Sequence, residues 1–157
     1  MRSINWTKPI GGTEQLLNLV PGLVREVFWK RQRAIKGEAP SKVGTGRAAA
    51  WTAEDALQAA TLHEMANLGV MLSESWRVWL MVREAMILRQ VGGPRSATGA
   101  ILACNSKGEV LLREFDGADP TSAGLDHRGA PAVFVVVRIG QLIDRIEGRI
   151  IEAGELA

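Results

Sequence analysis

Two short apolar stretches near the N-terminus predict a pair of helices. In TEQLLNLV (residues 13–20), Thr13 suits the N-cap, and the leucines form a short helix that Pro21-Gly22 ends. Residues 23–33 repeat with a helical period. The predicted core arc contains Leu23, Val24, Val27 and Phe28, and the opposite arc contains Arg25, Glu26, Trp29, Lys30, Gln32 and Arg33. Arg31 lies on the apolar side, where we expect its stem to lie flat and its charged head to reach solvent.

This pair has the pattern of a helix-turn-helix, because a tight turn separates the helices and the second carries basic and aromatic residues outward. The pattern is common in all-helical proteins, so the following segment matters. Residues 36–47 (KGEAPSKVGTGR) predict a basic hairpin with a glycine-rich tip. A hairpin in this place is typical of a wing along the phosphate backbone, where Lys42 and Arg47 would be useful.

Two further helices are predicted between positions 52 and 91. Thr52 and Asp55 have the spacing of a capping box, and Gly69 suits the left-handed position that ends a helix. Ser73 suits the N-cap of the next helix, which runs to Gly92-Gly93-Pro94. One side of that helix contains Trp76, Trp79, Leu80 and Ile87, and the other contains Val78, Met81, Val82, Ala85 and Leu88. We expect one side to pack within its own domain and the other to meet a second chain.

The C-terminal part changes to strand patterns. TGAILAC and EVLLREF predict a hairpin, and the valine-rich AVFVVVR predicts another strand. A final helix has Leu142, Ile143, Ile146 and Ile150 on its inner face. The predicted fold class is α+β: an N-terminal winged helix-turn-helix with a long dimerisation helix, then a small lobe of antiparallel sheet and helix. We expect domains at residues 1–73, 74–93 and 94–157.

Charge is distributed unequally, although the formal net charge is only +2. Residues 1–95 contain 13 Lys/Arg and 8 Asp/Glu, a net of +5, whereas residues 96–157 carry a net of −3. The surplus is concentrated in residues 25–47, with seven basic and two acidic side chains. This surplus fits a polyanion-binding surface, and an ordinary solvated basic face is the competing interpretation.

Candidate catalytic chemistry is sparse. LHEMANLG (62–69) is one substitution away from the H-E-x-x-H zinc-protease pattern, because Asn67 replaces the second histidine. The other histidine is His127, and Cys104 is the single cysteine, which disfavours both a zinc site and a cysteine nucleophile. No G-x-x-x-x-G-K-[ST] phosphate loop occurs. We therefore predict no enzyme activity, no metal and no other cofactor.

The composition favours a cytoplasmic protein without membrane contact. The hydrophobic fraction of 46% is ordinary for soluble proteins. No apolar run approaches the roughly 20 residues that a membrane helix needs. The N-terminal MRSINWTKPIGG lacks the apolar segment of a signal peptide, and a lone cysteine cannot form an internal disulfide.

Residues 13–91 resemble the MerR-type winged-helix DNA-binding domain. The segment GRAAAWTAEDALQAATLHEMANLGVMLSES follows that family's pattern of a wing-closing arginine, an aromatic, an acid-capped helix, then L-G and a turn into a dimerising helix. The recognition helix departs from it, because Phe28-Trp29-Lys30 stands where the family usually has Arg-Tyr-Tyr. Phe28 cannot replace that arginine at phosphate. The resemblance implies a homodimer on a two-fold related site, bridged by an antiparallel pair of helices from residues 74–91.

Together these observations favour a sequence-specific transcriptional regulator of bacterial or phage type that binds double-stranded DNA as a homodimer. Arg25 and Arg33 are the expected base readers, because arginine pairs bidentately with guanine. The expected phosphate contacts are Lys30, Lys42 and Arg47. Trp29 is expected to contact nucleic acid or a partner, because an aromatic on the polar arc has no obvious packing role.

Two alternatives stay open. The winged helix could organise DNA for packaging or recombination, or bind another protein, without a regulatory role of its own. RNA polymerase or another protein is a candidate partner, and the C-terminal lobe is a candidate for binding a small effector.

Overall fold

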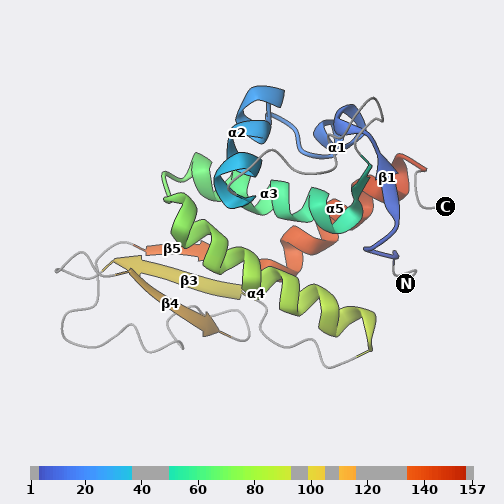
Figure 1. The fold of residues 1–157 in the computed structure, drawn as a ribbon. Helices are drawn as coiled ribbons and strands as arrows, with labels where there is room; N and C mark the ends of the chain where they lie inside the picture. Colours follow the sequence, from blue (N-terminus) through green and yellow to red (C-terminus); the bar gives the residue numbers. More distant parts are fainter. Residues whose placement is uncertain (1–3, 37–49, 93–98, 105–109, 116–133, 155–157) are drawn as a thin grey trace. The chain divides into compact units, whose positions relative to one another are not determined.

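Helices form most of the described chain, and small antiparallel sheets complete a mixed α+β fold (Figure 1). The computed structural model describes residues 4–36, 50–92, 99–104, 110–115 and 134–154. The helices are α1 (Thr13–Leu19), α2 (Arg25–Lys36), α3 (Ala53–Asn67), α4 (Leu72–Gln90) and α5 (Ile139–Glu152). The strands are β1 (Pro9–Gly11), β2 (Trp51–Thr52), β3 (Gly99–Cys104), β4 (Val110–Phe115) and β5 (Phe134–Val137). The predicted wing, with Lys42 and Arg47, lies outside the described residues beyond position 36.

The chain divides into two compact units. One contains Met1–His63 and Arg145–Ala157, and the other contains Glu64–Asp144. Both α3 and α5 therefore contribute residues to each unit. The domain division at residues 1–73, 74–93 and 94–157 stays a prediction.

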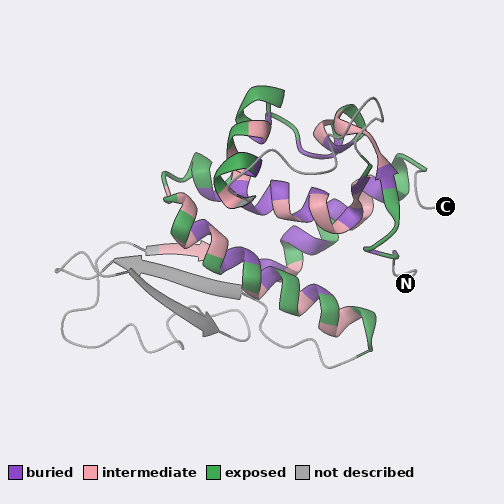
Figure 2. Cartoon of the chain, in the orientation of Figure 1, coloured by how far each residue is buried: buried purple, intermediate pink, exposed green. Residues whose placement is uncertain are grey.

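Apolar side chains fill the first unit. Strands β1 and β2 pair antiparallel and place Gly11 opposite Trp51, which is fully buried. Figure 2 shows the buried residues of α1, α2 and α3 in purple. The large buried side chains include Ile4, Trp6, Ile10, Leu16, Leu19, Phe28, Trp51, Leu57, Leu62, Ile146 and Ile150.

The end of α5 belongs to this first unit through two polar contacts. Glu147 accepts a hydrogen bond from the backbone N–H of Ile4 at 3.2 Å. The guanidinium of Arg149 donates to the carbonyl oxygen of Leu19 at 3.0 Å. Leu19 ends α1, and the last carbonyls of a helix have no partner within it. Arg149 therefore satisfies the C-terminal end of α1 from a distant part of the sequence.

The two sequence signals that bound α3 are confirmed. The backbone N–H of Thr52 donates to Asp55 Oδ2 (2.9 Å), and that of Asp55 donates to Thr52 Oγ1 (3.2 Å), which is a reciprocal capping box. At the other end Gly69 has φ of 76°, and Val70 N–H donates to the carbonyl of Met65 (3.0 Å). That bond across five residues is the Schellman motif, so both ends of α3 are fixed locally.

The expected cap of the next helix is wrong. Met71 is the N-cap of α4, and Ser73 lies inside the first turn. Helix α4 begins as soon as the chain leaves the turn at Gly69. A serine cap contributes only about 1 kcal/mol, less than the burial of one large apolar side chain such as Trp79, so packing sets the start of this helix.

One face of α4 is buried and another apolar side is exposed (Figure 2). The buried residues, spaced by three or four, are Ser75, Val78, Trp79, Val82 and Met86. Leu80 and Ile87 are 49% and 40% exposed. We expected both sides of α4 to be buried, and in the single chain only one face is.

The predicted C-terminal hairpin is confirmed. Strand β3 pairs antiparallel with β4 from Gly99 opposite Phe115 to Cys104 opposite Val110, and with β5 along its other edge, in the order β4-β3-β5. The predicted inner face of α5 is also buried, namely Leu142, Ile143, Ile146 and Ile150. The guanidinium of Arg89 pairs with Asp144 at 2.6 Å, which ties the end of α4 to the first half of α5.

The two glycines Gly69 and Gly148 predict opposite effects of the same substitution. Gly69→Ala should lower the free energy of unfolding by about 1 kcal/mol, because alanine is strained at a φ of 76°. Gly148→Ala should raise it by about 0.5–1 kcal/mol, because Gly148 is inside α5 and an added Cβ meets nothing within 4 Å. Urea unfolding of both variants measures the difference. If both substitutions changed the free energy of unfolding by the same amount in the same direction, this account of the turn at Gly69 would be contradicted.

Candidate functional site

The turn between α1 and α2 requires glycine. Gly22 has φ of 84°, and a Cβ added there would lie 3.3 Å from Nε2 of His63. The N–H of Leu23 donates to the carbonyl of Val20 at 3.1 Å and closes the turn. The tight turn expected from the sequence is therefore present, and α2 begins two residues after it.

Helix α2 is rotated about its axis relative to the sequence prediction. Phe28 and Gln32, one turn apart, are each 2% exposed, whereas Val24 and Val27 are 57% and 36% exposed. The expectations that both valines face the core and that Gln32 faces solvent are wrong. Packing Phe28 against Trp51 buries more apolar surface than two valines offer, so Phe28 faces inward and the valines lie at the surface.

This rotation leaves polar atoms inside. Arg31 is half-buried, and its Nη1 is buried without a hydrogen-bond partner, so this nitrogen of the charged head does not reach solvent. Burial lowers the pKa of Arg31, because desolvation disfavours the charged form. Gln32 donates to Oε1 of Gln58 at a long 3.5 Å, while its own Oε1 is buried without a partner. Aromatic packing therefore holds the helix in this orientation against a polar cost.

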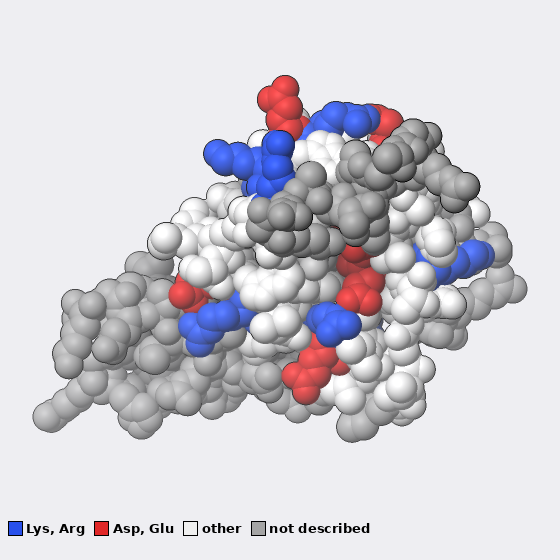
Figure 3. All heavy atoms as spheres, in the orientation of Figure 1, with Lys and Arg blue, Asp and Glu red and all other residues white. Residues whose placement is uncertain are grey.

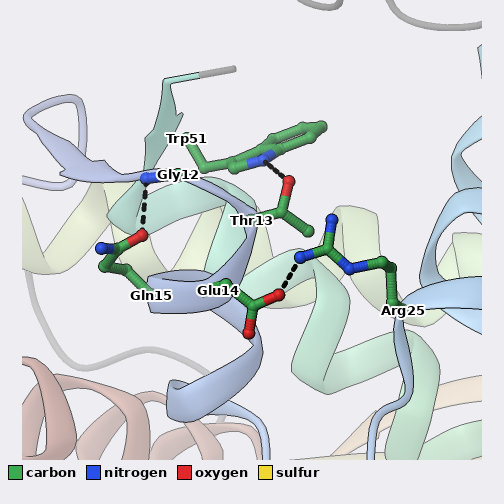
Figure 4. Close-up of polar contacts among 6 residues, drawn as sticks. All are labelled: Gly12, Thr13, Glu14, Gln15, Arg25 and Trp51. Carbon is green, nitrogen blue, oxygen red and sulfur yellow. Dashed lines mark hydrogen bonds and ion pairs between the residues drawn. The ribbon is translucent and has the colours of Figure 1, made fainter. Parts of the chain in front are cut away.

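The predicted contact cations on α2 all lie at the surface: Arg25, Lys30 and Arg33 are exposed. Figure 3 shows basic side chains with acidic ones beside them over this helix. Arg25 forms an ion pair with Glu14 of α1 (Figure 4), a contact that the sequence reasoning missed. Lys30 and Arg33 form no ion pair with any residue in the described ranges. The acidic Glu26 is exposed beside them in the first turn.

Trp29 is half-buried in an aromatic cluster with Phe28 and Trp51. Its ring centroid lies 5.4 Å from that of Phe28 and 5.6 Å from that of Trp51. Phe28 and Trp51 are 5.1 Å apart and nearly edge-to-face at 79°. The expectation that Trp29 lacks a packing role is therefore wrong, although the residue is only half-buried.

Thr13 connects this aromatic cluster to α1. The indole N–H of Trp51 donates to Oγ1 of Thr13 at 3.1 Å (Figure 4). Thr13 is the first residue of α1, and Gly12 is its N-cap, so the predicted capping role of Thr13 is wrong. The side chain of Gln15 accepts from Gly12 N–H at 3.0 Å instead. Residues from α1, α2 and β2 thus meet at one buried tryptophan, which fixes the geometry of the helix pair.

The structure describes only some of the residues on which the other chemistries considered from the sequence would depend. No group of three or more His, Cys, Asp or Glu side chains there could hold a metal ion. In LHEMANLG, His63 is half-buried, and Glu64 and Asn67 are exposed at the end of α3. His127 and the side chain of Cys104 lie outside the description. None of the described helices is long and apolar enough to cross a membrane.

Comparisons with known proteins do not identify a family. No family model, curated protein or solved structure matches the chain. The resemblance to MerR-type domains rests on the sequence motif and the order of elements. A function must therefore be argued from the residues of α1, α2 and α4 themselves.

The hydrogen bond from Trp51 predicts a specific stability loss. Thr13→Val keeps the shape of the side chain but removes the acceptor, leaving a buried indole N–H unsatisfied at a cost of about 1–3 kcal/mol. Thermal unfolding and tryptophan fluorescence measure the change. Thr7→Val is the matched control, because the Thr7 hydroxyl bonds to Asn5 at an exposed site. An equal loss in both variants would argue against the anchoring role of Thr13.

Proposed function

We propose that the protein is a sequence-specific transcriptional regulator that binds double-stranded DNA through a MerR-like winged helix-turn-helix and acts as a homodimer. One observation carries the proposal: α2 follows a tight turn, exposes Arg25, Lys30 and Arg33, and is held by the aromatic cluster beneath it. The major groove accepts an α-helix, and a helix fixed by packing presents its side chains to bases in a constant register.

The exposed cations divide by role under this proposal. Arg25 and Arg33 are eight residues apart, about 12 Å along the helix axis, which spans roughly three to four base-pair steps. Each would read guanine, and Lys30 would contact phosphate together with Lys42 and Arg47 of the proposed wing. The exposed edge of Trp29 would contact the DNA backbone.

The ion pair between Arg25 and Glu14 is compatible with base reading. Exposed ion pairs contribute about 0–1 kcal/mol, so a bidentate guanine contact worth about 1–3 kcal/mol can displace Glu14. Until then the carboxylate keeps the guanidinium beside the first turn of α2. Glu14 therefore positions Arg25 without blocking it.

The exposed side of α4 supports the homodimer. Leu80 and Ile87 are seven residues apart and so lie on one stripe of the helix. Trp76, which is half-buried, and Arg83 continue the three-and-four spacing of that stripe. An antiparallel copy of α4 would cover the apolar side chains of Trp76, Leu80 and Ile87.

An architectural DNA-binding protein is the second candidate. The exposed Lys30 and the proposed wing cations would contact phosphate without selecting a sequence. The same surface could therefore organise DNA broadly. The distribution of bound sites distinguishes the two functions.

DNA selection from a random library with the full chain tests the proposal. We expect enrichment of a short inverted repeat. With six phosphate contacts per dimer, affinity should fall roughly 10³-fold between 50 and 200 mM salt. Enrichment of no sequence, with uniform binding to all fragments, would favour the architectural function, and absence of DNA binding would overturn both.

The double variant Arg25→Ala, Arg33→Ala tests the assigned readers. It should lose the guanine-dependent part of its preference for the selected site over a scrambled site, whereas Lys42→Ala should weaken binding to both about equally. Arg77→Ala is the control, because Arg77 is an exposed arginine of α4 that pairs with Glu74 and has no assigned contact with DNA. A preference for the selected site that is undiminished by the double change would place guanine reading on other residues.

The α4 stripe predicts the oligomeric state. Leu80→Glu combined with Ile87→Glu should convert a dimer into a monomer in sedimentation experiments, because two charges would face the partner helix. Both side chains are exposed in the single chain, so circular dichroism should be unchanged. Ile151→Glu, at a 52% exposed position on α5, should leave the dimer intact. A dimer that tolerates both charges on α4 would exclude this interface.

A further inference from the structure

The start of α2 has two exposed valines. The carbonyl of Val24 accepts the first helical hydrogen bond, from Phe28 N–H at 3.0 Å, which makes Val24 the N-cap. Val27 lies in the following turn. Their exposed fractions are 57% and 36%, so neither side chain is explained by the core of the first unit.

Local helix stability does not explain the valines either. Valine is among the poorest N-cap residues, because it cannot accept a hydrogen bond from the free N–H groups of the first turn. Valine within a helix also loses side-chain freedom relative to alanine or leucine. Single exposed apolar residues are ordinary, but these two flank Arg25 and Glu26 at the helix end that enters the major groove in helix-turn-helix proteins.

The surrounding charges indicate which partner fits. Arg25 and Lys30 are exposed beside the valines and suit a polyanion, while the valines require an apolar group within it. The one apolar group at the base edges of the major groove is the C5 methyl of thymine. The adjacent Glu26 would repel phosphate but can accept a hydrogen bond from the amino group of cytosine.

We propose, on the basis of the proposed DNA-binding function, that Val24 and Val27 read thymine methyl groups. The two residues are separated by about 4.5 Å along the helix axis, close to the 3.4 Å spacing of bases along a strand. They therefore contact thymines on neighbouring base pairs. The preferred half-site combines these thymines with the guanine that Arg25 reads.

The test replaces each thymine of the selected site with deoxyuridine, which removes only the C5 methyl. At the contacted positions the wild-type chain should lose about fourfold in affinity per methyl. Val24→Ser should bind the thymine site with that reduced affinity and should no longer respond to deoxyuridine at one position. Val27→Ala should also bind the thymine site with reduced affinity, and it should no longer respond to deoxyuridine at the neighbouring position.

Stability provides an independent check on the Val24 variant. Serine is a strong N-cap residue, so Val24→Ser should raise the Tm by roughly 3 °C while DNA affinity falls, a combination that misfolding cannot produce. Ile151→Ala is the control for loss of an exposed aliphatic side chain elsewhere, and it should retain the full response to deoxyuridine.

The outcomes separate the inference from the function on which it rests. If the wild-type chain binds a selected site and deoxyuridine changes nothing, or if both valine variants keep the full penalty, thymine reading is overturned and DNA binding stands. If the wild-type chain binds no DNA, the proposed function fails and the inference fails with it.

Discussion

The burial of Trp51 determines how the rest of the first unit is arranged. Its ring packs on Phe28 and Trp29, and its indole N–H is held by Thr13, so one side chain connects β2 to α1 and α2. A buried aromatic removes about 150–250 Å² from water, which corresponds to roughly 4–6 kcal/mol. Each unsatisfied buried polar group costs about 1–3 kcal/mol, so the buried atoms of Arg31 and Gln32 offset part of this gain.

The outward face of α2 is a consequence of this packing. Because Phe28 faces inward, polar atoms of Arg31 and Gln32 are buried, and the side chains of Val24 and Val27 are exposed. The helix keeps its charged face outward, with Arg25, Lys30 and Arg33 exposed, but it also has buried polar atoms on its inner side and two valines at the surface. The packing of the inner face of α2 therefore determines which side chains form the surface that we propose for DNA reading.

Features that depend on neighbouring residues could be predicted from the sequence. The capping box of Thr52 and Asp55 closes over three residues, and the β3–β4 hairpin pairs adjacent segments, so local chemistry was sufficient. The left-handed turn at Gly69 was predicted for the same reason, because few other residues adopt its φ.

The rotation of α2 could not be predicted in this way. The valines and Phe28 share one predicted apolar arc, and Trp51, the partner against which Phe28 packs, comes 23 residues after Phe28 in the sequence. Hydrophobic periodicity shows that a helix has an apolar side but cannot show which residues of that side are buried deepest. For the candidate site, exposure of Arg25, Lys30 and Arg33 was correctly expected, whereas Glu14 and the packing of Trp29 depend on tertiary contacts.

Contacts between the two ends of the chain show why the compact units do not follow consecutive stretches of the sequence. Arg149 satisfies the carbonyl of Leu19 across 130 positions, and Glu147 accepts from Ile4 across 143. A fragment ending after α4 would lack both contacts and the buried Ile146 and Ile150. The last turn of α1 would then lose a partner immediately before the turn that sets the start of α2. The unit that carries the proposed reading helix is therefore completed by residues from the opposite end of the chain.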